Sequence, residues 1–194
     1  MHRLFVGIDP PFDVKDALME MQGGIIGARW QSEDQLHMTL RFLGDQTVDQ
    51  ANDIAEALAG ISALPLTLHL SGVGTFDRRG RIDQLWARVK PPEEALRLHR
   101  KINRALAMIG VEEDRRTYQP HITLARFSRG AGPLEDFMVR HGDLRIQAFT
   151  VSEFCLYESI LSQEGAEYRI VERYPFAQGA LFGFSEISEL GLGS

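Results

Sequence analysis

The stretch His37-Met38-Thr39-Leu40-Arg41-Phe42 returns 84 residues later in the chain as His121-Ile122-Thr123-Leu124-Ala125-Arg126-Phe127. Both copies begin with alternating polar and apolar residues, which is the pattern of a half-buried β-strand. Residues two apart in a strand project from the same face, so each copy presents one imidazole and one hydroxyl together. The apolar residues between them point into the core. The sequence therefore predicts two similar strands that carry matching polar groups.

Two such strands, facing each other across a groove, form a site with two imidazoles and two hydroxyls. Imidazoles can divide acid and base work because their ordinary pKa of about 6.5 lies near neutral pH. Threonine hydroxyls can bond phosphate oxygens, and in-line attack on a phosphodiester needs a base, an acid and such donors. We predict that His37 and His121 are catalytic and that Thr39 and Thr123 bind phosphate. The residues alone leave the acid and the base unassigned.

The composition bounds what the rest of the molecule does. The chain has 194 residues, 44% of them hydrophobic and 25% charged, which is typical of a soluble globular protein with one domain or two small lobes. The formal net charge of −6 excludes a generally basic surface that holds duplex nucleic acid by charge alone, but it allows a local basic site. The basic residues are 18 Arg and 3 Lys. We attribute this excess to GC-rich coding, with bidentate phosphate contacts as the alternative.

Apolar periodicity predicts a mixed order of strands and helices. The expected strands are Leu4–Ile8, Leu36–Leu43, Leu64–Val73, Gln84–Val89, Pro120–Phe127, Ile146–Tyr157 and Tyr168–Tyr174. The expected helices are Asp13–Met21, Val48–Ile61, 91–110 and Leu134–His141. Several strands follow one another through short loops, without the βαβ rhythm of a parallel sheet, which favours an α+β fold with antiparallel sheet.

Three segments are interpreted as connections. Ser159–Ala166 is polar and contains Gly, so we expect a hairpin loop. Gly72-Val73-Gly74 is too far from a helix start to form a dinucleotide-binding loop, and a turn at a strand end is preferred. Arg78-Arg79-Gly80-Arg81 is a compact basic loop, which is either a solvated hairpin tip or a track for an RNA backbone.

The single cysteine, Cys155, excludes a disulfide framework and a thiolate zinc site, and it is expected to be a small buried side chain. The first residues have the pattern of a strand rather than a signal peptide, so a cytoplasmic protein is expected. No stretch approaches 18 apolar residues, which predicts no transmembrane helix. Residues 177–194 carry four Gly and only acidic charges, so we expect a loosely packed tail.

The twin His-x-Thr-Leu motif resembles that of the two-histidine (2H) phosphoesterases. Among these, residues 3–175 are most similar to the RNA 2′,3′-cyclic phosphodiesterases, once called 2′-5′ RNA ligases. The supporting stretches are Arg3–Ile8, Arg29-Trp30, Leu36–Gly44, Gly72–Phe76, Pro120–Arg126 and Leu156–Ser159. The resemblance implies a bilobal α+β fold, in which two pseudo-symmetric lobes with antiparallel sheets surround a central groove. Residues 1–176 are then a single bilobal catalytic domain.

The activity implied by the resemblance is metal-independent hydrolysis of 2′,3′-cyclic phosphate ends of RNA to a 2′-phosphate, together with reversible 2′-5′ RNA ligation. The implied partners are RNA 3′ termini or 2′,3′-cyclic nucleotides, with no cofactor, no metal, no membrane, and a monomeric protein. In this family-based assignment His37 donates a proton to the leaving 3′ oxygen and His121 activates water. Thr39 and Thr123 hold the phosphate oxygens.

Further substrate contacts are expected from residues outside the His-Thr pairs. Arg126 matches the Arg that follows the family's second motif, but five residues after His121 is the wrong parity on an ideal strand, so a bulge must turn it inward. Arg41 has the right parity, with a surface charge as the alternative. Tyr157 is predicted to stack on a base, whereas core packing is the preferred interpretation for Phe5.

Two other functions remain open from the sequence. One is a 2H phosphodiesterase that acts on a small cyclic nucleotide. The other is a non-catalytic RNA-binding module or a metal site with two His, although two ligands are too few for a closed zinc site and neither motif contains an acidic residue.

Overall fold

The computed structural model describes residues 1–114, 116–128, 130–162 and 165–177. Its elements follow the chain as β1 (His2–Ile8), α1 (Phe12–Glu20), β2 (Arg29–Trp30), a 3-10 turn (Glu33–Gln35), β3 (Met38–Gln46), α2 (Val48–Ala59), β4 (Leu66–Arg78), β5 (Arg81–Lys90), α3 (Pro92–Met108), β6 (His121–Arg126), α4 (Glu135–His141), β7 (Arg145–Val151), β8 (Glu153–Ser162) and β9 (Gly165–Pro175). The α+β class with antiparallel pairing is confirmed. The tail beyond residue 177, predicted to be loosely packed, lies outside the described residues.

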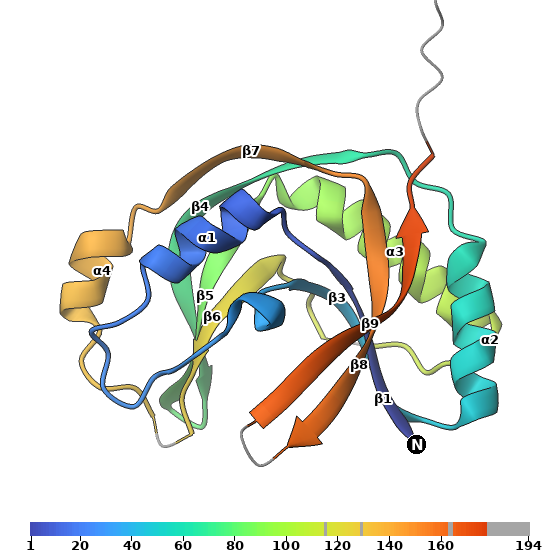
Figure 1. The fold of residues 1–194 in the computed structure, drawn as a ribbon, viewed down its shortest axis with the longest axis horizontal. Helices are drawn as coiled ribbons and strands as arrows, with labels where there is room; N and C mark the ends of the chain where they lie inside the picture. Colours follow the sequence, from blue (N-terminus) through green and yellow to red (C-terminus); the bar gives the residue numbers. More distant parts are fainter. Residues whose placement is uncertain (115, 129, 163–164, 178–194) are drawn as a thin grey trace, which may run out of the picture.

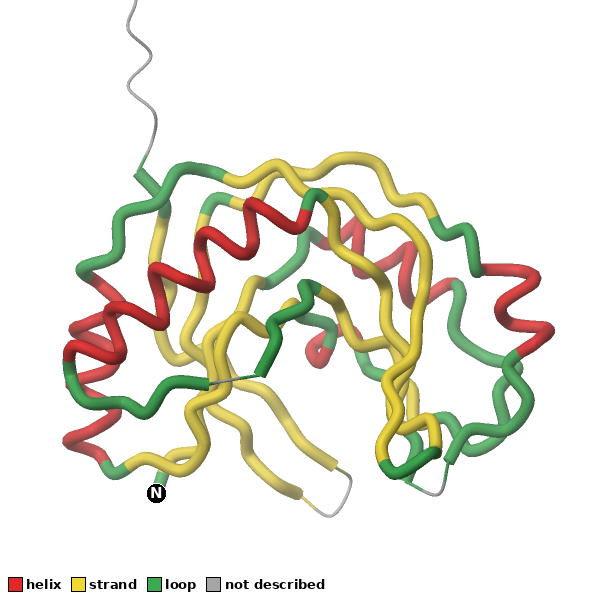
Figure 2. Tube along the Cα trace, turned by 180° about the vertical axis from the view of Figure 1, so that it is seen from behind, coloured by secondary structure: helices red, strands yellow, loops and turns green. Residues whose placement is uncertain are grey.

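The described strands form one antiparallel sheet in the order β7-β4-β5-β6-β3-β1-β8-β9, with β2 paired to β6. The resemblance implied two lobes with antiparallel sheets around a groove, whereas the described strands of both halves belong to one continuous sheet. The first half, β3-β1-β8-β9, meets the second half, β7-β4-β5-β6, at one ladder pair between Met38 and Ile122. The sheet curves into an arch, and the β4–β5 and β8–β9 hairpins extend toward the same end of the molecule (Figures 1 and 2).

All four helices contribute to one buried apolar cluster on the sheet. The helical members with the least exposure are Val14, Leu18, Ile54, Leu58, Ala95, Leu98, Ile102, Leu106 and Phe137. Their three- and four-residue spacing within α1, α2 and α3 is that of a helix with one apolar face. This cluster stabilises the arch from one side, so the other face of the central strands is left for polar groups.

Local sequence signals account for several element boundaries. Thr47 and Gln50 form a capping box at the start of α2, which satisfies two backbone N–H groups that have no partner within the helix. Pro92 occupies the first turn of α3, where a missing N–H costs nothing. Gly110 follows that helix at φ +83°, a conformation that favours Gly.

Three connections differ from the sequence prediction. The expected strand Ile146–Tyr157 is divided at Ser152 into β7 and β8. The expected loop Ser159–Ala166 is mostly strand, because β8 and β9 remain paired up to the Ser162–Gly165 pair. The expected turn Gly72-Val73-Gly74 lies inside β4, where Gly72 has φ +82° at a register shift. Polar composition suggested the loop at Ser159–Ala166 and two glycines suggested the turn at 72–74, but in both places cross-strand pairing continues the strand.

Gly74 has a packing reason for being Gly. A Cβ at this position would overlap the Trp86 ring on the neighbouring strand β5, so only Gly lets the indole cover β4. Separately, none of the helices in the described ranges is long and apolar enough to cross a membrane.

Candidate active site

The two motif histidines occupy equivalent places and have the same hydrogen bond. His37 directly precedes β3, and His121 is the first residue of β6. The Nδ1–H of His37 donates to the carbonyl oxygen of Gln35, and that of His121 donates to the carbonyl oxygen of Gln119, each over 2.7 Å. A carbonyl only accepts, so each Nδ1 carries the proton. In the neutral ring, Nε2 is therefore the free base.

The strand register brings the two motifs together. The pair Met38–Ile122 joins β3 to β6, and each member is flanked by the His and the Thr of its own motif. In an antiparallel register, the His of one motif then lies beside the Thr of the other, on the face opposite the buried Met38 and Ile122. Within the first motif, the His37 imidazole Nε2 and the Thr39 hydroxyl are 3.0 Å apart. The structure thus gathers all four predicted residues of the motifs.

The two imidazoles differ in their electrostatic surroundings. His37 is only 6% exposed, and burial lowers its pKa to about 4, with the charge of Arg126 acting in the same direction. His121 is half-buried, and burial together with Arg126 also lowers its pKa. The hydrogen bonds to Gln35 and Gln119 oppose these shifts because they favour the charged rings. Both imidazoles therefore favour the neutral form.

A β-bulge turns Arg126 toward the histidines. Adjacent residues of β5 pair with Thr123 and Ala125, so Leu124 is an extra residue in β6. The extra residue reverses the alternation of faces after it. Arg126, five residues after His121, is consequently placed on the same face, and its charge acts on both imidazoles. This is the inward turn that the sequence interpretation required.

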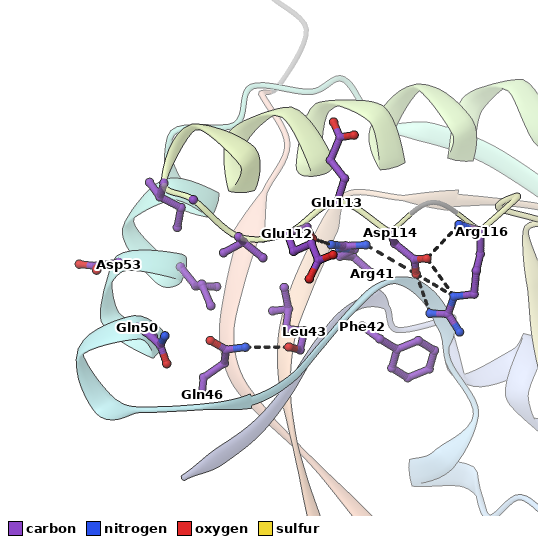
Figure 3. Close-up of a pocket in the computed structure, with 14 residues that line it drawn as sticks. Arg41, Phe42, Leu43, Gln46, Gln50, Asp53, Glu112, Glu113, Asp114 and Arg116 are labelled. Atoms are coloured by element: carbon purple, nitrogen blue, oxygen red, sulfur yellow. Dashed lines mark hydrogen bonds and ion pairs between the residues drawn. The ribbon is translucent and has the colours of Figure 1, made fainter.

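The same bulge in the first motif removes Arg41 from that face. Adjacent residues of β1 pair with Thr39 and Arg41, so Leu40 is the extra residue of β3. Arg41 is 6% exposed and its guanidinium donates to the carbonyl oxygen of Glu112, with the Asp114 carboxylate 3.5 Å away (Figure 3). The parity argument for Arg41 was wrong, and Arg41 is not a surface charge either. Arg41 therefore joins the segment that contains Glu112 and Asp114 to β3.

Tyr157 and Phe5 form the wall behind His37. The two rings stack at a centroid distance of 4.7 Å, and the Phe5 ring lies 4.8 Å from the imidazole of His37. Tyr157 is 3% exposed and Phe5 is 2% exposed, so neither ring has a face open to a base. The structure therefore places Tyr157 in packing rather than in the base-stacking position expected from the sequence, and Phe5 packs as preferred.

Other aromatic rings are more accessible beside the histidines. Tyr168, half-buried on β9, contacts His37 edge-on at 5.0 Å, and Phe76, half-buried on β4, contacts His121 edge-on at 4.9 Å. Phe42 is 50% exposed on the face that the Leu40 bulge gives it. Sequence reasoning missed all three. Phe42 could have been identified from the sequence, because it follows His37 by five residues as Arg126 follows His121.

Two unlike cavities lie near the candidate site, one lined by His121 and one that reaches the site only through Arg126. One, of about 250 Å³, is lined by Thr39, Phe42, Phe76, Tyr118 and His121 among others. The other, of about 830 Å³, is lined by Arg126 and by further arginines. Within the described part of the chain, no three His, Cys, Asp or Glu side chains are grouped in a way that suits a metal ion.

The family of the chain follows from its sequence profile. The profile of the 2′-5′ RNA ligase superfamily matches residues 27–161, which is more than half of the chain. The chain belongs to this superfamily. Its membership confirms the resemblance that the twin motif indicated.

Curated relatives carry one common name, RNA 2′,3′-cyclic phosphodiesterase. The protein from Aeropyrum pernix is 31% identical over 71% of this chain and 80% of its own length. The protein from Archaeoglobus fulgidus is 26% identical over 86% of this chain and 96% of its own length. The protein from Geobacillus stearothermophilus is 29% identical over 88% of this chain, but the matched region is only 56% of that relative.

Solved structures share the fold. A Thermus thermophilus protein, TT0787, superposes with a TM-score of 0.76 at 24% identity, covering 90% of this chain and 97% of that one. Escherichia coli LigT in complex with 3′-AMP superposes with a TM-score of 0.73 at 24% identity, covering 91% and 99%. These likenesses establish the architecture in which the two histidines lie.

Proposed function

We propose that this protein is an RNA 2′,3′-cyclic phosphodiesterase, which opens a 2′,3′-cyclic phosphate at an RNA 3′ end to leave a 2′-phosphate. The observation that carries the proposal is the paired geometry of His37 and His121. Each imidazole has its Nδ1–H held by a backbone carbonyl, so Nε2 is the atom that exchanges protons. The shared name of the curated relatives supports the same reaction.

The proposed reaction uses three kinds of group. One neutral Nε2 accepts a proton from water as the water oxygen attacks phosphorus, and one protonated Nε2–H donates to the 3′ oxygen as its bond to phosphorus breaks. The hydroxyls of Thr39 and Thr123 and the guanidinium of Arg126 donate hydrogen bonds to the other phosphate oxygens. A 5′ hydroxyl that attacks in place of water gives the 2′-5′ linkage that the superfamily name describes.

We assign the acid to His37 and the base to His121, following the family pattern. The lowered pKa of His37 means that the free protein holds this imidazole neutral at neutral pH. The acid role therefore requires that the anionic phosphate, bound beside Arg126, raises the pKa of His37 by opposing the guanidinium charge. The base role of His121 needs no such change, because its pKa is already lowered.

The test uses 2′,3′-cyclic mononucleotides without added metal and identifies the product as the 2′- or the 3′-phosphate. We expect the 2′-phosphate only, and loss of turnover in His37→Ala and in His121→Ala. His69→Ala, which removes an imidazole of β4 outside the site, is the matched control and should retain activity. Normal turnover in both motif variants refutes the proposal. A chelator arm separates this mechanism from a two-His metal site, since only the latter loses activity.

A further inference from the structure

A cavity of about 830 Å³ shares Arg126 with the candidate active site and is unusually basic. We call it the arginine cavity, and its charged lining residues are Arg29, Arg78, Arg79, Arg81, Arg126 and Asp83. Among its described lining residues, five guanidinium groups thus face one carboxylate, in a chain whose net charge is −6. All of these arginines except the half-buried Arg126 are exposed.

Cross-strand pairing places these like charges directly side by side. Arg79 and Gly80 form a two-residue turn with φ values of +54° and +74°, so the hairpin closes with Arg78 opposite Arg81. On the other side, Arg29 of β2 pairs with Arg126 of β6. Like charges directly opposite each other destabilise a sheet. Two such pairs in one cavity favour the binding of an anion, because its negative charge offsets the repulsion between the paired arginines.

The arginines of this cavity are distinguished by their number in one place, since the described residues Arg88, Arg100, Arg104, Arg140, Arg145 and Arg169 also lack an ion pair but do not line it. Arg3, Arg97, Arg116 and Arg173 each lie within 4.0 Å of an Asp or Glu oxygen. Within the described ranges, none of the five cavity arginines has such an ion pair, so their guanidinium groups remain available to phosphate oxygens. Guanidinium groups bind phosphate with two parallel hydrogen bonds, which a lysine ammonium does not offer.

Arg126 connects this cavity to the reaction site, because its charge acts on both imidazoles and its side chain also lines the cavity. Resting on the proposed function, we infer that the arginine cavity binds internucleotide phosphates of a single RNA strand just upstream of its terminal cyclic phosphate. The other cavity, which His121 lines, contains Phe42, Phe76 and Tyr118. Its two described arginines, Arg41 and Arg116, both form an ion pair with Asp114, so they are not free for a phosphate as the arginines of the arginine cavity are. An RNA end is therefore bound in one direction, with its backbone toward the β4–β5 hairpin.

The test compares two substrates that share the same reacting group: a 2′,3′-cyclic mononucleotide and a short single-stranded oligonucleotide with the same cyclic terminal nucleotide. The variants are Arg78→Gln, Arg81→Gln and the double variant, and Arg97→Gln on α3 is the matched charge-loss control. We expect the double variant to lower kcat/KM for the oligonucleotide by roughly tenfold or more, the worth of one or two charge-assisted hydrogen bonds. Its turnover of the mononucleotide and its melting temperature should stay at the wild-type values.

Salt dependence gives a second readout. The slope of log(kcat/KM) against log salt for the oligonucleotide should become shallower by about 0.7 for each phosphate contact removed. Equal losses on both substrates, or an unchanged oligonucleotide rate and slope, overturn the inference. If the wild-type protein turns over neither substrate, the proposed function fails. In that case, fluorescence anisotropy with a labelled oligonucleotide ending in a 2′-phosphate still decides whether the double variant binds RNA more weakly.

Discussion

The two halves of the sheet carry the same motif but surround its histidine with different residues. In the first half, Phe5, Tyr157 and Tyr168 surround His37, which is 6% exposed. In the second half, His121 is half-buried and has Arg126 five residues after it, whereas the equivalent residue after His37 is Phe42. A repeated motif therefore produces two chemically unequal imidazoles, because burial and charge come from the neighbouring strands.

The largest expected effect tests whether both halves are needed. Replacing His37 or His121 with Ala should lower kcat for a 2′,3′-cyclic nucleotide by roughly 10²–10⁴-fold, the usual contribution of general acid or base catalysis. The double variant should be hardly worse than either single one, because the two groups act in one proton-transfer sequence. Multiplied losses in the double variant would show that the two imidazoles act independently.

Arg126→Gln probes the charge that only the second half supplies. We expect kcat/KM to fall about 10- to 100-fold, since charge-assisted hydrogen bonds contribute about 1.5–3 kcal/mol. The guanidinium lowers the pKa of both imidazoles, so its removal should also shift the pH–rate profile to higher pH. A matched change in the first half, Phe42→Gln, should leave the profile in place. A loss of rate without any shift in the profile would separate Arg126 from the histidines.

The pH dependence distinguishes the free protein from its complex. Because burial lowers both histidine pKa values, the limbs of the kcat/KM profile should lie below the ordinary value of about 6.5. The limbs of the kcat profile should lie higher, since a bound phosphate favours protonated imidazole. Rate measurements from about pH 4 to 9 test this, and coincident profiles contradict the role assigned to the phosphate.

The free energy of unfolding should depend on pH because the pKa of His37 is lowered in the folded protein. The pKa of His37 is about 4 in the folded protein and about 6.5 in the unfolded chain, so the unfolded state binds more protons between these values. The free energy of unfolding should therefore fall by up to roughly 3 kcal/mol as the pH drops from 6.5 to 4. Denaturant unfolding of the wild-type protein and His37→Gln measures it. An equal pH slope in both proteins contradicts the assignment.

The smallest expected effect concerns Tyr157, whose ring stacks on Phe5 beside His37. The Tyr157 hydroxyl is buried beside the Cys155 thiol and makes no hydrogen bond of regular geometry with the described residues. Tyr157→Phe removes this unsatisfied group and keeps the stacked ring, so stability should change by less than about 1 kcal/mol or increase. Turnover should remain within about twofold, as for other changes that leave packing intact. A large loss of kcat would instead give the hydroxyl a part in catalysis.

Much of the architecture could be predicted from local pattern. Alternation within the two motifs predicted their strands, helical spacing predicted α1 to α4, and antiparallel sheet followed from the short connections. The twin motif also indicated the superfamily, which the comparison confirmed. These features were accessible because each depends on residues that are close together in the chain.

By itself, the sequence determined that two His-Thr pairs exist and that each lies on one face of a strand. Only the tertiary structure decided that the bulges at Leu40 and Leu124 bring Arg126 in and turn Arg41 away, and that the Tyr157 ring is covered. Bulges and register arise from pairing between strands that are distant in the chain. The alternation of residues along one strand does not show where an extra residue interrupts its pairing with a neighbouring strand.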